Sequence, residues 1–250
     1  MRQAASAEDF VARVGQDFDA VRRSLLSGSS VLDRRSAGGT PITNYFTDPG
    51  PDGQRETNYT IHQITRPGLP ADFVLGIKHV ALYAAVLPQI VQSGRYRVVA
   101  LVRDPVSLLM SWRSLDLPIS RGRLPAGERF WPELKTLGGA ELEMTEKQIR
   151  ICDLLFGRFL RWAKRVAILR YEELVADPAR LLRMAGIPEI GSPPATAVIK
   201  RTPPARAGDD GRIDLAERIR QLAAAGELPA ICKCYPDYAS GHRAPVERRL

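Results

Sequence analysis

The chain has 250 residues, of which 44% are hydrophobic and 26% charged, a composition that is ordinary for one soluble globular domain. Its 36 lysines and arginines against 28 aspartates and glutamates give a formal net charge of +8, which favours anionic ligands. Because no arginine-rich tract with interleaved aromatic residues appears, nucleic acid is disfavoured relative to a small anionic ligand.

Cysteine, histidine and hydropathy patterns narrow the class of protein further. Three cysteines do not make a disulfide framework, and Cys232 and Cys234 form a pair without a second pair, so we expect reduced thiols and no metal site. No apolar run reaches the roughly 18 residues of a membrane span. The first residues also lack the pattern of a signal peptide. These features predict a cytoplasmic protein without a membrane span.

The N-terminal part of the chain predicts one helix and then a long connection. Residues 6–26 form an amphipathic pattern in which apolar residues recur every three or four positions, and Gly28 ends it. Residues 27–72 are rich in Gly, Pro, Ser and Asp and show little periodicity, so we predict an irregular connection. Within it, residues 35–40 have the composition of a phosphate-binding loop, but no convincing helix follows them.

The middle of the chain predicts alternating strands and helices. Residues 73–79 form a candidate strand, and residues 80–91, which include a proline, form a candidate helix. The valine-rich run 98–102 is typical of a strand that is buried on both faces of a parallel sheet. Asp104 and Pro105 then have the residue types of a helix N-cap and a first helical position.

The second half of the chain continues this alternation. Residues 117–139, which carry Phe130 and Trp131, predict either a lid over an acceptor site or a long exposed connection whose aromatic residues dock on the core. Thr145 and Gln148 have the spacing of a capping box. The remaining expected elements are a helix to residue 163, a strand over 166–171, a helix over 177–186, a basic loop over 200–212, a helix over 215–225 and a polar tail. Strands alternating with helices predict an α/β fold, a parallel sheet flanked by helices on both faces.

The junction after the strand at 98–102 is a candidate phosphate site. A helix N-terminus offers unpaired N–H groups and the positive end of the helix dipole, and Arg103 lies at this junction. Ser107, Ser111 and Ser114 form a polar stripe along the predicted helix. The same residues are also compatible with an ordinary capped helix start beside a surface arginine.

Arg103-Asp104-Pro105, with Ser111 eight positions after the arginine, resembles the 3′-phosphate-binding segment of the sulfotransferases that use 3′-phosphoadenosine-5′-phosphosulfate (PAPS). In that family the matching arginine and serine bind the 3′-phosphate of the nucleotide, so the resemblance implies these roles for Arg103 and Ser111. Tyr171 opens a Tyr-Glu-Glu-Leu segment that is similar to the family's Tyr-Glu-Asp-Leu segment, whose tyrosine lies near the adenine. By its position alone, Tyr171 is better explained as a strand-end aromatic residue with its hydroxyl in water.

The resemblance extends to five further positions. Arg206, Gly208 and Gly211 match the arginine and both glycines of the family's Arg-Lys-Gly-x-x-Gly motif, with alanine in place of the lysine, which implies a loop that closes over the 3′-phosphate. Lys78 matches the lysine that contacts the transferring sulfuryl group. His79 is a candidate catalytic base. In the family, however, the histidine lies one residue later. Neighbouring residues of a strand point to opposite faces of the sheet, so the alternative is that His79 is an ordinary polar histidine at the end of a strand.

The resemblance implies a single domain over residues 1–250 with the P-loop NTPase-like sulfotransferase fold, supported over 73–240 and unsupported over 1–72. PAPS would be the co-substrate, without a metal, and the acceptor would be a hydroxyl or amine of a small molecule, lipid or glycan. The strand and loop that hold the 5′-phosphosulfate in the family are not evident, so the loop either lies upstream of Met1, which makes the fold N-terminally incomplete, or is lacking. The second alternative predicts a non-catalytic sulfotransferase-like protein that binds a nucleotide or a partner. A small kinase is disfavoured because the motif G-x-x-x-x-G-K-[ST] is absent.

Overall fold

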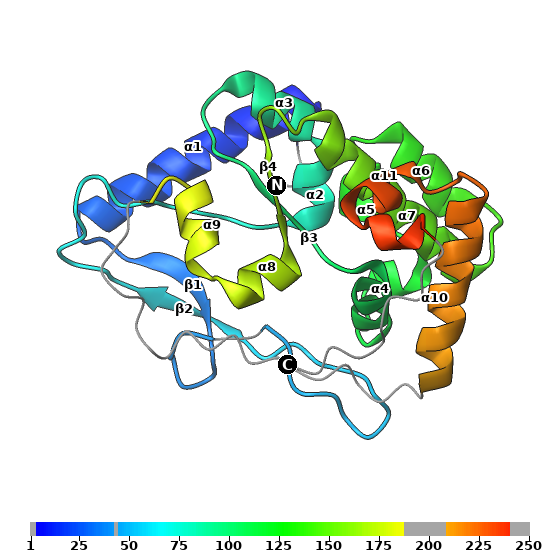
Figure 1. Ribbon diagram of the computed structural model, residues 1–250. Coiled ribbons are helices and arrows are strands. Elements are labelled where there is room, and N and C mark those ends of the chain that lie inside the picture. Colours follow the sequence, from blue (N-terminus) through cyan, green and yellow to red (C-terminus); the bar gives the residue numbers. More distant parts are fainter. Residues whose placement is uncertain (1–3, 43–44, 188–208, 241–250) are drawn as a thin grey trace.

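The computed structural model describes residues 4–42, 45–187 and 209–240, and two short parallel strands lie near its centre (Figure 1). β3 (Val99–Val102) pairs with β4 (Ala167–Arg170) in a register that places Val102 opposite Arg170. Both strands form where the sequence predicts them, and helices flank the pair. The predicted α/β class with a parallel sheet is therefore confirmed, for a small sheet.

The two faces of this parallel sheet are covered unequally. Ala100 and Val102 share one face and are buried, whereas Leu101, on the opposite face, is 47% exposed. Leu169, the residue of β4 that pairs with Leu101, is completely buried. The prediction that the strand at 98–102 is buried on both faces is wrong at Leu101, because the described residues leave that part of β3 open to solvent.

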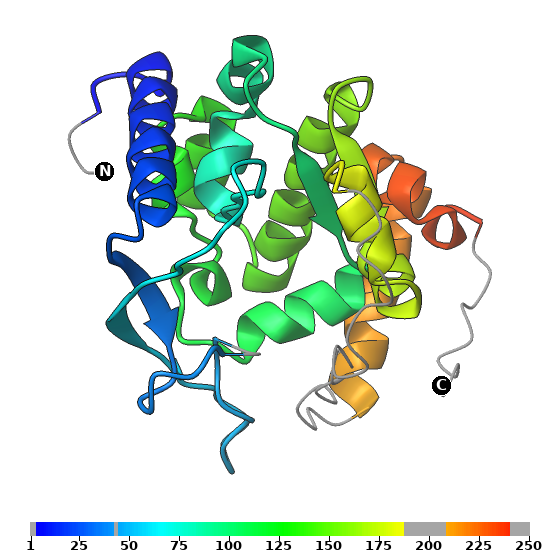
Figure 2. The ribbon, with the colours of Figure 1, turned by 90° about the vertical axis from the view of Figure 1, so that its left-hand side faces the viewer.

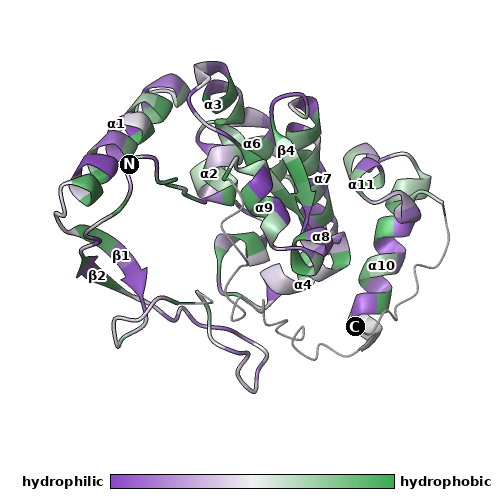
Figure 3. Cartoon of the chain, turned by 60° about the vertical axis from the view of Figure 1, so that its left-hand side comes forward, coloured by the Kyte–Doolittle hydropathy of each residue, from purple (hydrophilic) through white to green (hydrophobic). Residues whose placement is uncertain are grey.

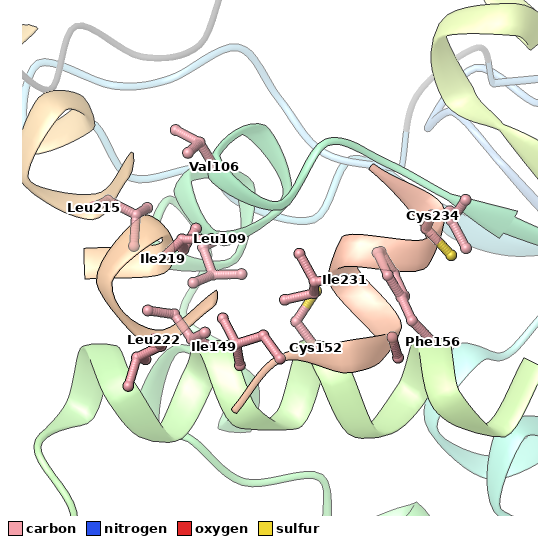
Figure 4. Packing of buried hydrophobic residues seen from close by; sticks show 13 residues of the cluster. Val106, Leu109, Ile149, Cys152, Phe156, Leu215, Ile219, Leu222, Ile231 and Cys234 are labelled. Atoms are coloured by element: carbon pink, nitrogen blue, oxygen red, sulfur yellow. The ribbon is translucent and has the colours of Figure 1, made fainter. Parts of the chain in front are cut away.

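A hydrophobic core packs against the buried face of β3 and joins four helices (Figure 4). These helices are α4 (Pro105–Arg113), α7 (Met144–Arg161), α10 (Asp209–Ala224) and α11 (Pro229–Cys234). Leu109 of α4, Ile149 of α7 and Ile231 of α11 are all completely buried. Hydrophilic and hydrophobic residues alternate along α10, and its hydrophobic residues enter the same core (Figure 3). The core thus fixes the position of α4 and of the β3–α4 junction.

The predicted N-terminal helix is confirmed as α1 (Ala7–Leu26). The Ser6 hydroxyl accepts a hydrogen bond from the Asp9 N–H at 3.1 Å, which caps the first turn. Gly28 follows the helix with a φ of 70°, a left-handed conformation that glycine adopts without steric cost. Figures 1 and 2 show α1 on the side of the molecule away from α10 and α11.

The helix predicted over residues 80–91 is divided into two. α2 (Val80–Ala85) has Val86 as its C-cap, and α3 (Leu87–Ser93) begins directly after Val86 with Pro88 in its first turn. Proline has no N–H to donate and is tolerated only in the first turn of a helix, so the chain ends one helix and starts another. Both helices bury apolar residues against Phe10 and its neighbours on α1.

Residues 27–72, predicted to be irregular, contain an antiparallel strand pair. β1 (Val31–Arg35) pairs with β2 (Thr60–Ile64), and Val31 lies opposite Ile64. Each strand has only five residues, and a long connection separates them. The prediction was wrong because the pairing of such short strands depends on distant partners more than on local periodicity.

Residues 73–79, predicted as a strand, have no regular secondary structure. Val74 and Ile77 are exposed, so the apolar residues of this segment form no buried strand face. The segment is held by α1 instead: Arg22 donates a hydrogen bond to the Phe73 carbonyl at 2.8 Å, and its guanidinium carbon lies 4.5 Å from the centre of the Phe73 ring. The strand prediction is therefore wrong.

The Pro- and Gly-rich stretch 117–139 packs on the core. It forms three short helical segments, which are η1 (Pro118–Arg121), α5 (Pro125–Glu128) and α6 (Pro132–Gly139). Trp131 is only 2% exposed, and the Arg158 guanidinium carbon lies 4.3 Å from the centre of its indole ring. The aromatic residues thus dock on the core, which was one of the two predicted alternatives.

The long helix α7 begins one residue earlier than its predicted cap. Glu143 is the N-cap, and its carboxylate accepts a hydrogen bond from the Glu146 N–H at 3.0 Å. The Thr145 hydroxyl instead accepts a hydrogen bond from Arg113 at 2.8 Å, and the Gln148 side-chain carbonyl accepts another from Arg113 at 3.0 Å. The capping-box prediction is wrong because these two side chains bind α4 rather than their own helix.

The C-terminal part of the described chain is less polar than predicted. After β4 come α8 (Tyr171–Ala176) and α9 (Ala179–Met184). The tail was predicted to be polar, but α11 places Ile231 and Cys234 in the core. A short 3-10 helix, η2 (Pro236–Tyr238), follows α11. This segment brings two tyrosines to the parallel strands.

The buried carboxylate of Glu128 gives a first prediction. Arg123 donates to both of its oxygens, at 2.9 and 2.5 Å, and the Leu124 N–H donates at 2.7 Å. Arg123→Ala is expected to lower the free energy of unfolding at pH 7 by about 2 kcal/mol, because a charged hydrogen-bond partner of a buried group is lost. The hydrogen bonds from Arg123 are the main cause that lowers the pKa of Glu128, and burial opposes them. This contribution is present above the ordinary pKa of 4.5 and is lost as the pH falls.

Urea unfolding at about pH 7 and about pH 3 tests this prediction. The difference between wild type and Arg123→Ala should shrink on acidification. Arg121→Ala is the matched control, because Arg121 pairs with Asp116 in an exposed ion pair that contributes little to the free energy of unfolding. If both variants lower the free energy of unfolding equally, the stabilising role assigned to the Arg123–Glu128 pair is contradicted.

Candidate anion-binding site

Two of the predicted site residues meet at the carboxyl ends of the parallel strands. Arg103 follows β3 directly, and Tyr171 follows β4 directly. Because Val102 and Arg170 lie opposite each other, the residues that follow them are neighbours in space. The Arg103 guanidinium carbon lies 4.8 Å from the centre of the Tyr171 ring, within the range of a cation–π contact. The carboxyl ends of parallel strands are where α/β folds usually bind ligands.

The charge of Arg103 has no partner of opposite sign within the described residues. The ion pairs found there involve other arginines. Two carboxylates, those of Asp104 and Glu172, nevertheless belong to residues adjacent in sequence to Arg103 and Tyr171. Arg103 is a half-buried residue, and a guanidinium without a carboxylate partner is able to bind an anion.

The two neighbouring carboxylates are bound to other groups. Asp104 accepts hydrogen bonds from the Ser107 N–H at 2.9 Å and from the Tyr238 hydroxyl at 2.7 Å. Glu172 accepts hydrogen bonds from the Asp104 N–H at 3.1 Å and from the Tyr235 hydroxyl at 3.0 Å. Neutral donors therefore use all four carboxylate oxygens, and no ion pair with Arg103 forms.

This network shifts the ionisation of both tyrosines. Burial raises the pKa of the Tyr235 hydroxyl far above its ordinary value, and the Glu172 carboxylate raises it further. Burial also raises the pKa of Tyr238, and Asp104 adds to the effect in the same way. A phenolate beside a carboxylate would bring two negative charges together, so both hydroxyls stay protonated and donate.

Tyr238→Phe is expected to change the alkaline stability of the protein. A tyrosine whose pKa is raised in the folded state contributes stability below its ordinary pKa of about 10, and this stability is lost as the pH rises above that value. The variant should lose about 1 kcal/mol at neutral pH, because an Asp104 oxygen loses its donor, and should then show a shallower decline above about pH 10. Urea midpoints at about pH 8 and about pH 11 measure both effects.

Tyr59→Phe is the control for this experiment, since the Tyr59 hydroxyl forms no hydrogen bond with another described residue. It should decline with pH as the wild type does. A Tyr238→Phe variant with the steep wild-type decline would show that the hydrogen bond to Asp104 does not set the alkaline transition.

The N-terminus of α4 is less open than predicted. Asp104 caps it, so the Ser107 N–H is already satisfied. Ser111 lies one turn further on the same face as Ser107. Ser111 is a half-buried residue, and its hydroxyl has no hydrogen-bond partner among the described residues, whereas the Ser114 hydroxyl donates to the Ser111 carbonyl. Asp104 thus occupies one N–H group of this helix start, and no described contact joins Ser111 to Arg103.

Lys78 and His79 lie outside this arrangement of contacts. The Lys78 amine lies 4.7 Å from the centre of the Tyr45 ring, and its side chain is exposed. His79 caps α2, where its Nδ1 accepts a hydrogen bond from the Leu82 N–H at 3.4 Å. Residues 73–79 form no strand, so Lys78 and His79 do not lie on opposite faces of one. No described contact joins either residue to Arg103.

The predicted glycine-rich loop is only partly described. Arg206 and Gly208 lie outside the described residues. Gly211 was predicted to be in a loop but lies in the first turns of α10, where a Cβ atom would meet nothing within 4 Å. Packing within the described chain therefore does not require a glycine at this position.

Three residues of the carboxylate network were missed by the sequence analysis. Glu172 was visible only as one of two acidic residues after the strand, and Tyr235 and Tyr238 lay in the segment predicted as a polar tail. Their roles depend on contacts across more than sixty positions, as for Tyr235 and Glu172, which are 63 residues apart. No local pattern signals such contacts.

The fold and the site together define an α/β protein with a candidate anion-binding site at the carboxyl ends of a parallel strand pair. Across the described ranges, no helix is both long and apolar enough to cross a membrane. Among the same residues, no group of three or more His, Cys, Asp or Glu side chains is placed to hold a metal ion. No protein-family model matches the chain, and neither a curated protein nor a solved structure matches it significantly.

Proposed function

We propose that the chain is a PAPS-dependent sulfotransferase that transfers a sulfuryl group to a hydroxyl or amine of a small-molecule, lipid or glycan acceptor in the cytoplasm. One observation carries the proposal. Arg103 stacks on Tyr171 at the carboxyl ends of two adjacent parallel strands and has no carboxylate partner among the described residues. These are the two residues whose sequence segments resemble the 3′-phosphate and adenine sites of the family.

The chemistry of the site suits the 3′-phosphate end of the nucleotide. The planar guanidinium of Arg103 can donate two parallel hydrogen bonds to a phosphate, which is the strongest pairing an arginine makes. The free Ser111 hydroxyl can donate one more. The Tyr171 ring, held beside Arg103, offers an aromatic surface next to which an adenine can stack.

The proposal assigns proton removal to His79 and the sulfuryl contact to Lys78, the two residues directly before α2. PAPS supplies the activated sulfuryl group, while the acceptor hydroxyl or amine must lose a proton to a base. The Nδ1 atom of His79 accepts a hydrogen bond from the Leu82 N–H, so a neutral His79 carries its proton on Nε2. In this state its only lone pair, on Nδ1, is occupied and cannot take a proton from the acceptor. His79 can therefore act as the base only after this cap is released. Lys78 stays the proposed sulfuryl contact, with an exposed amine.

The proposed P-loop NTPase-like sulfotransferase fold accounts for the adjacent parallel strands, each of which leads into a helix. The phosphosulfate loop has no counterpart among the described residues. Residues 35–40, which have a suitable composition, begin at the last residue of β1, but the Ser36 and Thr40 hydroxyls hydrogen-bond to each other at 2.7 Å, and no helix directly follows. This observation favours the second candidate function, a non-catalytic sulfotransferase-like protein that binds a nucleotide or partner.

Calorimetric titration with adenosine 3′,5′-bisphosphate and with 5′-AMP tests the proposal. The two ligands differ only in the 3′-phosphate, so the site at Arg103 should bind the bisphosphate at least about tenfold more tightly, an effect of about 1.4 kcal/mol. Equal affinities, or no binding of either ligand, would contradict the proposal. If the bisphosphate binds, a transfer assay with labelled PAPS separates the enzyme from the non-catalytic alternative.

A further inference from the structure

The carboxylates of Asp104 and Glu172 lie near the β3–α4 junction, yet neither forms an ion pair with Arg103. A guanidinium attracts any carboxylate within a few ångströms, and the attraction is stronger where both groups are partly withdrawn from water. Glu172 follows Tyr171, on which Arg103 stacks, and its Oε1 lies 3.1 Å from the backbone nitrogen of Asp104. An ion pair of Glu172 with Arg103 would neutralise the site and compete with an anionic ligand.

We propose that Tyr235 and Tyr238 are positioning residues that hold the carboxylates of Glu172 and Asp104 away from Arg103, and so keep its charge available to an anionic ligand. The part of this inference that concerns the two carboxylates rests only on the described hydrogen bonds. The nature of the ligand, a phosphate group of a nucleotide, rests on the proposed function.

Each tyrosine binds one of the two carboxylates. The Tyr235 hydroxyl donates to Oε2 of Glu172 at 3.0 Å, while the backbone N–H of Asp104 binds Oε1. The Tyr238 hydroxyl donates to Oδ1 of Asp104 at 2.7 Å, while the Ser107 N–H binds Oδ2. Each carboxylate is thus held at both oxygens, which fixes its direction as well as its position.

The rings of the two tyrosines are themselves anchored. Tyr235 contacts two side chains: the Phe156 ring centre is 6.2 Å from the Tyr235 ring centre, and the Arg170 guanidinium carbon is 5.1 Å from it. Both tyrosines pack against the core that contains α11. The C-terminal segment of the described chain therefore binds the β3–α4 junction and Glu172 through two hydroxyl groups, and the described residues show no hydrogen bond, ion pair or ring contact between this segment and Arg103.

The reactivity of Arg103 toward phenylglyoxal tests this inference without any nucleotide. Phenylglyoxal modifies arginines that are free of ion pairs, and mass spectrometry of peptides measures its rate at Arg103, with Arg34 as an internal reference. Tyr235→Phe releases one oxygen of Glu172, and we expect modification of Arg103 to slow about threefold to tenfold. Tyr235→Phe/Glu172→Gln should restore the wild-type rate, because the freed side chain carries no charge.

The rescue separates positioning from a merely structural role. A loosened C-terminal segment would not be repaired by Glu172→Gln, so a double variant that stays slow would overturn the inference, as would a single variant that reacts as fast as wild type. Tyr59→Phe should leave the rate at Arg103 unchanged. If Tyr235→Phe fails to fold, Tyr238→Phe, which releases Asp104, is measured in its place with the same expected slowing.

Affinity for adenosine 3′,5′-bisphosphate gives the second measurement. We expect a threefold to tenfold weaker affinity in Tyr235→Phe and recovery in the double variant. If the wild type does not bind the bisphosphate, the proposed function fails, whereas the modification rates still decide whether the tyrosines keep Arg103 unpaired.

Discussion

Replacing Arg103 with alanine is expected to weaken the binding of adenosine 3′,5′-bisphosphate about thirtyfold and to leave the affinity for 5′-AMP nearly unchanged. The loss corresponds to about 2 kcal/mol, the usual contribution of a hydrogen-bonded charge to an anion. The effect should be large because Arg103 is half-buried and has no carboxylate partner among the described residues. Calorimetric titration of both ligands into wild type and variant measures it.

Arg34 offers a matched control for this substitution. Its guanidinium carbon lies 4.8 Å from the centre of the Tyr59 ring, the same distance as between Arg103 and Tyr171. Arg34 belongs to the β1–β2 pair, so Arg34→Ala removes the same charge and the same kind of stacking elsewhere. If both variants weaken the bisphosphate equally, the effect reflects the net charge of the chain, and Arg103 has no specific role.

Leu109→Ala is expected to lower the free energy of unfolding by about 3 kcal/mol. Leu109 is completely buried on α4, in the core that joins α4 to α7, α10 and α11 (Figure 4). Truncation removes apolar contacts and leaves a cavity between helices that are held on several sides, so the core cannot collapse fully into it. Urea unfolding followed by circular dichroism measures the change.

Leu101→Ala is the matched control for the core substitution. Leu101 lies on β3 near the same junction but is 47% exposed, so its truncation should cost less than about 1 kcal/mol. A small effect of Leu109→Ala, or equal effects of the two substitutions, would contradict the description of this core.

Several elements with local signals were predicted correctly from the sequence. Asp104 and Pro105 specify the start of α4 through their own chemistry, a side-chain cap and a fixed φ, and the structure confirms both. The strands β3 and β4 follow from dense runs of apolar residues. Thr145 shows the limit of such signals, because a side chain with the right spacing for its own helix binds Arg113 on another helix instead.

Elements that depend on distant partners were not predictable. β1 and β2 are short strands whose pairing spans a long connection, and residues 73–79 have the composition of a strand but no partner among the described strands. The candidate site divides in the same way. The segments of Arg103 and Tyr171 carry a recognisable pattern, whereas the hydrogen bonds from Tyr235 and Tyr238 are visible only once the chain is folded.

A crystal structure of the chain with adenosine 3′,5′-bisphosphate tests the central claim most directly. The account predicts the 3′-phosphate within hydrogen-bond distance of the Arg103 guanidinium and the Ser111 hydroxyl, with the adenine bordering Tyr171. The Glu172 carboxylate should still accept the hydrogen bond from the Tyr235 hydroxyl. A bisphosphate bound elsewhere, or an Arg103 that pairs with Glu172 while the ligand is bound, would contradict it.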